Sequence, residues 1–564
     1  MIDYKAKPFF LSDEDIAWVE ETYASMTDKE RIGKLFFPIG YSSDPGYLKY
    51  AMLSKHPGGM LFRTGTTREM FDTYRYLQTE SRIPMFTAAN LEAGGDGIVA
   101  EGTSFGKQMQ VAATGDPLSA YRLGKVCARE GKAVGCNYAF APVVDLDLNY
   151  HNPITNVRTY GKDPDRVITY ASEYIRACEE EGMLTSVKHF PGDGVDERDQ
   201  HIATTVNSLS AEEWERTYGR IYSALIAAGV RTVMAGHIAL PAYQSREEKY
   251  LPATLSHDIL TGLLRGKLGF NGMIISDATP MVGFCSAMER RKAVPAAIMA
   301  GCDMFLFNKD YDEDYGFMMD AYREGTLTDE RLEEAVKRIL ATKASMGMHR
   351  KDNRPSEEDL PIIGCDLHRR WAEECADAAV TLVKDREGLL PLNPGRYRKV
   401  LYQILGDCES NERVAKRFAE DMEKRGYTMI PYEREVFDFT KPLPFDSVAT
   451  FREKYDLVIY IGNIENASNK TTNRINWYTL FGLGNNMPWF VKEVPTVFIS
   501  LQNPYHLLDV PMIGTYINCY SNHDAMIDAV VNKINGGSEF RGKSPVDPFC
   551  GKDYLRDDVQ RNDI

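Results

Sequence analysis

The sequence predicts an α/β protein, with an N-terminal (β/α)8 barrel of the TIM type followed by a smaller C-terminal α/β sandwich. Two observations support this fold class. Short apolar runs alternate with longer stretches of helical composition, which is typical of parallel strands covered by helices. Eight such runs fall within roughly the first 310 of the 564 residues, and eight strands close a barrel. An open doubly wound sheet is the alternative, but no Gly-x-Gly-x-x-Gly segment follows the first run, so a dinucleotide-binding domain has no support.

The expected elements of the barrel begin with a helical lead-in over residues 12–30, for which Ser12 is a suitable N-cap. Apolar runs then predict strands near 33–39, 59–62, 83–88, 138–144, 183–187, 230–235, 272–276 and 302–307. The stretches between them predict helices near 66–79, 117–134, 164–181, 211–228, 256–267 and 287–300, with a further helix at 328–347. Each helix would return the chain to the start of the next parallel strand.

A polar, proline-containing stretch after residue 348 predicts a linker. We therefore expect a barrel domain over 1–348, a linker over 349–365 and a second domain over 366–564. The second domain should hold a smaller sheet between helices. Its expected helices lie near 366–379, 411–425 and 523–536, and its expected strands near 399–405, 428–431, 456–462, 495–500 and 514–518.

Charge and composition argue against several classes of partner. The formal net charge is −15 and the pI is about 5.3, which disfavours nucleic acid and anionic membrane surfaces, since both attract positively charged proteins. No run of about 18 apolar residues predicts a membrane span, and the N-terminus lacks the apolar core of a signal peptide. The ten cysteines include no Cys-x-x-Cys pair, so we expect reduced thiols, no structural zinc and a cytoplasmic protein.

Polar side chains collect at the C-terminal ends of the predicted strands, where barrel enzymes carry their active sites. They are Asn90, Glu92, Asp145, Asp147, Arg158, Lys188, His189, His237, Ser276, Asp277 and Asn308. Any one of them could be a helix cap or a satisfied hydrogen-bonding group, but their joint placement favours an active site. Asp277 stands out, because a carboxylate at a strand end suits a rigidly held nucleophile; the alternative is a cap for the next helix.

The stretch from Lys188 to His201 holds the densest group of titratable side chains, and its plain alternative is a solvated surface loop. Asp199 lies two residues before His201, so its carboxylate can orient the imidazole and raise its basicity. The pair therefore predicts a general acid and base.

Other groups in this loop leave further interpretations open. We assign Asp193, Asp196 and Glu197 to loop structure or solvation. A metal site formed by His189, Asp193 and His201 is an alternative, although no His-x-His or His-Glu-x-x-His spacing supports it.

Several segments resemble the family 3 glycoside hydrolases, and within them the β-N-acetylglucosaminidase branch. Lys188-His-Phe-Pro-Gly192 followed by Asp199-Gln-His201 is similar to the signature of that branch. The segments that resemble the nucleophile region, the following barrel strand and the start of the C-terminal sandwich are 251–277, 300–303 and 380–392. The resemblance spans nearly the whole chain and implies a barrel, a sandwich and retention of anomeric configuration.

The resemblance implies that Asp277 is the nucleophile, His201 the acid/base and Asp199 its partner, with no cofactor or metal. It assigns the binding of sugar hydroxyls to Lys188, His189, Arg158, Asn90 and Glu92. Asn90 stands where an aspartate is usual and so loses a charge-assisted contact, and Asp193 replaces a histidine of the signature. The implied partner is a small-molecule or oligosaccharide substrate with a terminal β-linked N-acetylhexosamine.

Three other functions stay open. A β-glucosidase or β-xylosidase of the same family would take its acid/base carboxylate from the C-terminal domain, where Glu465 is a candidate, but the Asp199–His201 pair argues against it. A β-N-acetylglucosaminide phosphorylase would use the neutral base to admit an anionic acceptor such as phosphate. A non-catalytic sugar-binding protein would require neither Asp277 nor His201 at these positions.

Overall fold

The computed structural model describes residues 2–433, 440, 446–480, 483–484 and 486–556. The chain divides into two compact units, neither of which is continuous in sequence. Unit 1 comprises Met1–Gln108 and Pro117–Arg369, and unit 2 comprises Met109–Asp116 and Arg370–Ile564. The outer ends of the two predicted domains, residue 1 and residues 557–564, lie outside the described residues.

Unit 1 is a closed barrel of parallel strands, which confirms the predicted fold class. Its strands are β1 (Phe36–Phe37) with β2 (Ile39–Gly40), β3 (Gly59–Phe62), β4 (Phe86–Ala89), β5 (Tyr138–Ala139), β6 (Leu184–Phe190), β8 (Thr232–Ala235), β10 (Met273–Ser276) and β11 (Phe305–Leu306). One sheet runs in the order β10-β8-β6-β5-β4-β3-β2. Pairing of β1 with β11, together with a parallel bridge between Ile275 and Met304, closes the ring.

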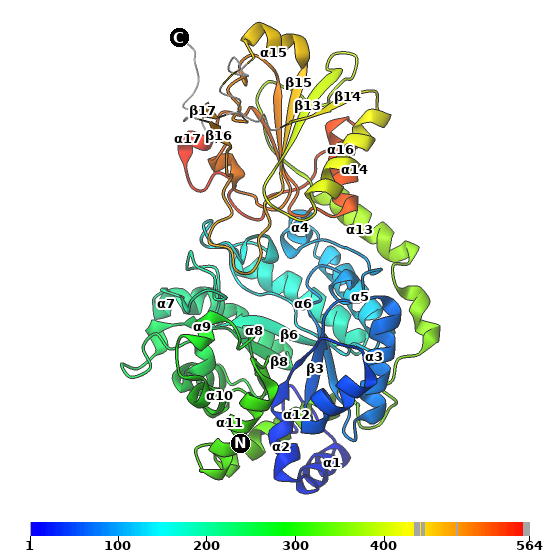
Figure 1. Ribbon diagram of the computed structural model, residues 1–564. Helices are drawn as coiled ribbons and strands as arrows, with labels where there is room; N and C mark the ends of the chain where they lie inside the picture. Colours follow the sequence, from blue (N-terminus) through cyan, green and yellow to red (C-terminus); the bar gives the residue numbers. More distant parts are fainter. Residues whose placement is uncertain (1, 434–439, 441–445, 481–482, 485, 557–564) are drawn as a thin grey trace. The chain divides into compact units, whose positions relative to one another are not determined.

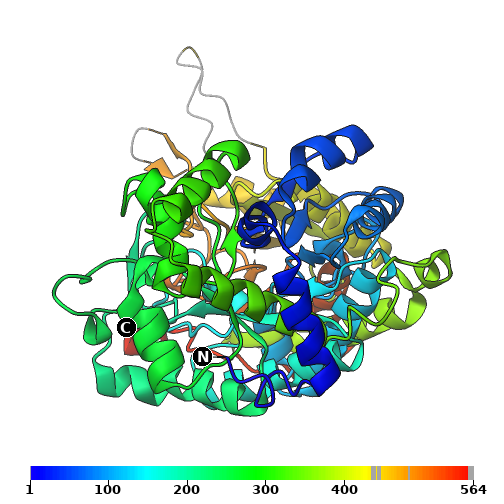
Figure 2. The same ribbon diagram turned by 90° about the horizontal axis from the view of Figure 1, so that it is seen from below.

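Helices of unit 1 surround these strands (Figures 1 and 2). They include α1 (Asp13–Ala24), α2 (Asp28–Lys34), α3 (Thr67–Glu80), α5 (Leu118–Ala133), α6 (Pro164–Glu180), α8 (Arg220–Ala228), α10 (Arg290–Ala300), α11 (Tyr311–Arg323) and α12 (Asp329–Ser345). The expected Ser12 cap is confirmed, since its hydroxyl accepts the Asp15 N–H at 3.2 Å. Among the described residues, no helix is both long and apolar enough to cross a membrane.

Two of the predicted helices differ in detail from those observed. The expected helix at 211–228 consists of α7 (Ala211–Trp214), a π-helical turn (Glu215–Gly219) and α8. The expected helix at 256–267 is π-helical over Asp258–Lys267. Apolar periodicity detects a helical face but does not distinguish these hydrogen-bonding patterns.

Unit 2 contains a six-stranded sheet with helices packed along it, as the predicted sandwich requires. Its strands are β12 (Thr381–Asp385), β13 (Lys399–Leu405), β14 (Thr428–Pro431), β15 (Leu457–Gly462), β18 (Thr496–Ser500) and β19 (Thr515–Asn518). The order is β12-β19-β18-β15-β13-β14, and only the edge strand β12 is antiparallel to its neighbour within this sheet. The helices include α14 (Asn411–Lys424), α16 (Asp524–Ile534) and, from Arg370 on, α13 (Asp366–Ala379). Of the six residues of α4 (Gln108–Ala113), the last five also belong to unit 2.

Candidate active site

Strand β6 ends later than the sequence predicted. The apolar run suggested an end before Lys188, whereas β6 continues to Phe190 and all seven of its residues are buried. Lys188 and His189 are therefore strand residues, exposed by only 3% and 5%. Such polar side chains are stable inside a barrel only when they have partners, and both have one on a neighbouring segment.

Asp277 directly follows β10 and is held by the strand next to it. Its N–H donates to the Ala235 carbonyl at 2.8 Å, and its Oδ1 accepts the Ala278 N–H at 2.7 Å. Burial opposes ionisation of this carboxyl, but the neighbouring imidazoles, that of His189 first, and the hydrogen bond from the Ala278 N–H outweigh it, so the pKa of Asp277 is lowered. An ionised, fixed carboxylate is what a nucleophile requires.

Asp199 and His201 form a hydrogen-bonded pair in the loop after β6. His201 Nδ1 lies 2.7 Å from Asp199 Oδ1, and the His201 N–H donates to the same oxygen at 2.9 Å. The Asp199 side chain is fully buried, whereas that of His201 is 25% exposed. An ionised carboxylate can only accept, so Nδ1 carries a proton and Nε2 is the atom at which His201 exchanges one.

Backbone hydrogen bonds bring this pair and Asp277 together. The segment after Asp277 returns to the β6 loop, where the Val282 N–H donates to the His201 carbonyl at 3.1 Å. The Gly283 N–H donates to the Gln200 carbonyl at 3.2 Å. Two segments about eighty residues apart in sequence are thus joined at one end of the barrel.

Glu92 joins two cations into a second polar cluster. Arg158 donates to both Glu92 oxygens, at 2.8 and 2.9 Å, and Lys188 Nζ lies 2.6 Å from Oε1. Burial raises the pKa of Glu92, but Arg158 and Lys188 more than compensate and hold it well below the usual range. With two cations and one carboxylate, the cluster has a net positive charge. Asn90, which follows β4, is exposed.

His189 belongs to a second His–Asp pair that sequence reasoning did not identify. Its Nδ1 lies 2.7 Å from Asp145 Oδ2, and its N–H donates to Asp145 Oδ1 at 3.1 Å. Its Nε2 faces Asp277 Oδ2 at 3.9 Å. Asp145 was visible in the sequence as a strand-end carboxylate, but its partner lies 44 residues away.

Comparison with known proteins identifies the family of the chain. Residues 41–342, more than half of the chain, match the family described as "Glycosyl hydrolase family 3 N terminal domain". The chain belongs to glycosyl hydrolase family 3. It is 43% identical to a Cellulomonas fimi protein described as "Beta-N-acetylglucosaminidase/beta-glucosidase", over 98% of this chain and 99% of that protein.

Solved structures of family 3 proteins show the same architecture. A structure described as "Beta-glucoside phosphorylase BglX bound to 2FGlc" has a TM-score of 0.92 at 42% identity, covering 98% of this chain and 100% of that one. A family 3 β-N-acetylglucosaminidase from Paenibacillus sp. has a TM-score of 0.77 at 22% identity, covering 93% and 99%. At 22% identity, the similarity to the Paenibacillus structure shows a shared fold and nothing more.

Another histidine of this family 3 barrel, His237, supports the peptide next to Asp277. His237 is fully buried, and its Nε2 lies 2.9 Å from the Ala278 carbonyl. A carbonyl can only accept, so Nε2 carries the proton and Nδ1 accepts from the Thr254 hydroxyl at 2.9 Å. Burial lowers the pKa of His237, which keeps the imidazole neutral.

The loop between Phe190 and His201 is packed rather than solvated along much of its length. Asp193 is only 2% exposed, so of the two roles predicted for it, loop structure or solvation, its burial supports loop structure, whereas Glu197 is exposed. Gly192 and Gly194 have positive φ angles of 122° and 99°. A Cβ on Gly194 would lie 1.9 Å from the Leu146 carbonyl oxygen, so this glycine is required by close packing.

The structure does not support the alternative of a metal in this loop. Within the described parts of the chain, no group of three or more His, Cys, Asp and Glu residues is arranged to hold a metal ion. The cysteines are all free thiols.

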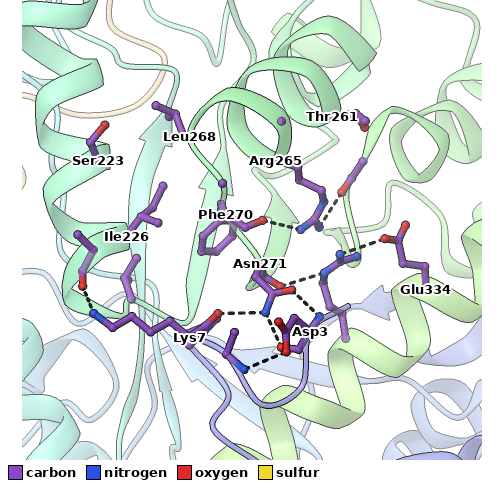
Figure 3. Close-up of a pocket in the computed structure, with 18 of the residues that line it drawn as sticks. Asp3, Lys7, Ser223, Ile226, Thr261, Arg265, Leu268, Phe270, Asn271 and Glu334 are labelled. Carbon is purple, nitrogen blue, oxygen red and sulfur yellow. Dashed lines mark hydrogen bonds and ion pairs between the residues drawn. The ribbon is translucent and has the colours of Figure 1, made fainter. Parts of the chain in front are cut away.

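A separate cavity of about 1170 Å³ lies at the other end of the barrel, lined by residues that precede the strands β8, β10 and β11. Figure 3 shows Asp3 and Lys7 of the N-terminal segment facing Asn271 there, with Arg265 nearby. Its charged groups pair with one another: Asp303, fully buried, accepts from Arg265 and Arg331 at 2.7 Å each. We interpret this cluster as the structural base of the barrel.

Proposed function

We propose that this family 3 protein is a retaining, exo-acting glycoside hydrolase that releases terminal β-linked N-acetylglucosamine. The observation that carries the proposal is the Asp199–His201 pair, tied by backbone hydrogen bonds to the segment that follows Asp277. A buried carboxylate that orients an accessible imidazole suits proton transfer, and an ionised carboxylate beside it suits nucleophilic attack.

The proposed reaction is a double displacement. His201, protonated at Nε2, gives that proton to the glycosidic oxygen while Asp277 attacks the anomeric carbon, and the aglycone leaves. The ester between Asp277 and the sugar is then cleaved by water, from which His201 Nε2 takes a proton. Two inversions at the anomeric carbon give net retention, and Asp199 stabilises the imidazolium in each step.

In this proposal the sugar lies against the Glu92 cluster. Arg158 and Lys188 supply charged donors, and Glu92 supplies an acceptor, so all three suit hydroxyl groups of a neutral pyranose. His189 Nε2, 3.9 Å from Asp277, faces the space next to the reacting centre. Asn90 would contribute a neutral amide contact at the edge of the site.

A second candidate function is phosphorolysis, in which phosphate instead of water attacks the glycosyl ester and yields a glycosyl phosphate. The observation that favours it is the similarity to a solved β-glucoside phosphorylase over 98% of this chain. The electrostatics agree, because a neutral imidazole does not repel a phosphate anion as a catalytic carboxylate would. The name of the Cellulomonas fimi relative leaves both N-acetylglucosamine and glucose as candidate sugars.

The alternative acid/base Glu465 receives less support. It follows β15 in unit 2, is half-buried, and lies 3.8 Å from the Cys408 thiol through Oε2. The Asp199–His201 pair already supplies a proton-transfer group within the unit that carries Asp277.

The test is a panel of nitrophenyl β-glycosides (N-acetylglucosaminide, glucoside, xyloside and N-acetylgalactosaminide), assayed with and without phosphate and with Asp277→Ala as the blank. We expect the highest kcat/KM for the N-acetylglucosaminide. Free sugar as the only product supports hydrolysis, and a phosphate-dependent sugar phosphate supports phosphorolysis. Full activity of Asp277→Ala would contradict both mechanisms.

A further inference from the structure

Two buried residues of the β6 loop, Asp193 and Gln200, take no part in the proposed chemistry. They contact each other, and Gln200 also contacts the backbone of His237, which lies against the peptide next to Asp277. Asp193 is 2% exposed and Gln200 is 1% exposed. Gln200 lies between Asp199 and His201 in sequence. Hydrogen bonds to its side chain therefore also restrict the backbone that carries this pair. Side chains of this polarity are buried only with hydrogen-bond partners.

The orientation of the Gln200 amide is determined by its neighbours. The His237 N–H donates to Gln200 Oε1 at 2.7 Å, and a backbone N–H can only donate. Gln200 Nε2 must then point the other way, where it donates to Asp193 Oδ2 at 3.2 Å. Asp193 is anchored in turn, because its Oδ1 accepts the Gly194 N–H at 2.7 Å.

These contacts continue to the proposed nucleophile. His237 Nε2 donates to the Ala278 carbonyl at 2.9 Å, and the Ala278 N–H donates to Asp277 Oδ1 at 2.7 Å. A chain of polar contacts therefore runs from Asp193 through Gln200 and His237 to Asp277. It crosses from the loop of β6 to the loops of β8 and β10.

An aspartic acid is better suited than an asparagine to the first position of this chain. Both Asp193 oxygens accept hydrogen bonds, from Gly194 and Gln200, whereas an amide has one acceptor and one donor. Burial and the neighbouring Asp145 raise the pKa of Asp193 to about 8. A protonated carboxyl can still accept at both oxygens, so these hydrogen bonds to Asp193 do not require a buried negative charge.

The charged and titratable groups that face Asp193, directly or through its partners, are Asp145, Asp147, Arg158, His189, Asp199 and Tyr218. The charges of Asp145 and Asp199 oppose ionisation of Asp193, and His189 is paired with Asp145. Burial raises the pKa of Tyr218, so its phenol stays neutral. Arg158 alone among them favours the ionised form directly.

We propose that Asp193 and Gln200 are positioning residues, which brace the Asp199–His201 pair against the segment that holds Asp277. The inference rests on the proposed function, because it assumes that His201 transfers the proton to the leaving group. Loss of the brace should displace His201 Nε2 from the glycosidic oxygen while leaving Asp277 in place. The effect should thus fall on acid catalysis rather than on substrate binding.

The test exchanges the two functional groups. Asp193→Asn alone places two amide donors against each other, and Gln200→Glu alone places two carboxyls against each other. The double variant Asp193→Asn/Gln200→Glu restores a donor–acceptor pair with reversed direction, while the Gly194 and His237 N–H groups keep their acceptors. Glu197→Gln is the matched control, since it changes an exposed carboxyl of the same loop to an amide.

The readout is kcat/KM for a β-N-acetylglucosaminide with a poor leaving group and for an activated nitrophenyl one. General acid catalysis is typically worth about 10²–10⁴-fold, so we expect a loss of about 10- to 100-fold on the poor leaving group and far less on the activated one. Asp193→Asn should show this loss at every pH, and Gln200→Glu should show it above about pH 8, where Asp193 no longer has a proton to donate to the introduced carboxylate. The loss in Gln200→Glu should grow with pH as the paired carboxyls ionise. The double variant should regain most of the activity, and Glu197→Gln should match the wild type.

Wild-type rates in both single variants, or equal losses on both substrates, would overturn the brace. Failure of the double variant to regain activity would also overturn it, and this comparison still applies if a single variant does not fold. Failure of the proposed function has a different signature: His201→Ala would then lack any dependence on the leaving group, whatever the brace variants do.

Discussion

Asp193 makes the stability of the barrel depend on pH in a way that can be calculated. The quantity to be compared is the free energy of unfolding of the wild type and of Asp193→Asn, measured from pH 5 to pH 9. Burial and Asp145 raise the pKa of Asp193 from 3.8 to about 8 in the folded protein. Between these values the unfolded chain has lost the proton and the folded chain keeps it, so stability falls as pH rises. The contribution is fully present below the unfolded pKa and is lost by about pH 8.

The magnitude follows from the size of the shift. One pKa unit corresponds to about 1.4 kcal/mol, so the wild type should lose roughly 4 kcal/mol relative to Asp193→Asn between pH 5 and pH 8, and little beyond. Denaturant unfolding of both proteins at each pH measures this difference. Any constant loss from the altered Gln200 contact cancels from its pH dependence. A flat difference from pH 5 to pH 8 would refute the reasoning, because it would mean that the carboxyl is already ionised when folded.

Four further predictions concern single groups. Asp277→Ala should reduce turnover of an aryl β-N-acetylglucosaminide by on the order of 10⁴-fold or more, and substantial residual activity would point to another nucleophile. His201→Ala should lose about 10²–10⁴-fold on poor leaving groups and much less on activated ones, whereas equal losses would indicate another acid. Glu92→Gln should raise KM in steady-state assays, because Arg158 and Lys188 lose the carboxylate that holds them; an unchanged KM would remove the cluster from the sugar site. Asp303→Asn should destabilise unit 1 by about 3–5 kcal/mol in denaturant unfolding, since it leaves Arg265 and Arg331 buried without their counter-ion, and an unchanged midpoint would contradict the structural role of the cluster.

The barrel could be predicted from the sequence because its strands are buried on both faces. A strand such as β10, with all four residues buried, leaves a continuous apolar run that needs no knowledge of the partner strand. Helix α11 (Tyr311–Arg323) was not predicted, because its buried positions include Asp314, which interrupts the apolar face. The charge of that aspartate is met by Arg290, a contact that apolar periodicity cannot reveal.

The site could be predicted only in part. Asp277 and the Asp199–His201 pair stood out because each occupies a strand end or a short local motif. The roles of Asp145 and His237 depend on His189 and Ala278, which lie 44 and 41 residues away, so no local pattern marks them. The sequence left loop structure and solvation open for Asp193 for a related reason, since a carboxylate among glycines and acidic neighbours carries no local sign that it is buried.

The short segment 109–116 limits how the two units can be separated or recombined. It is encoded within the barrel region but belongs to unit 2, where Ala113 accepts the Lys543 N–H at 2.9 Å and Gln110 meets His523 at 3.0 Å. Met109 and Val111 are fully buried there. A single cut in the linker would leave segment 109–116 on the barrel fragment, separated from the rest of unit 2. Unit 2 therefore cannot be transferred to another barrel as one continuous piece of sequence. These eight residues must be transferred as well, into the position of the other barrel that corresponds to the connection between α3 and α5.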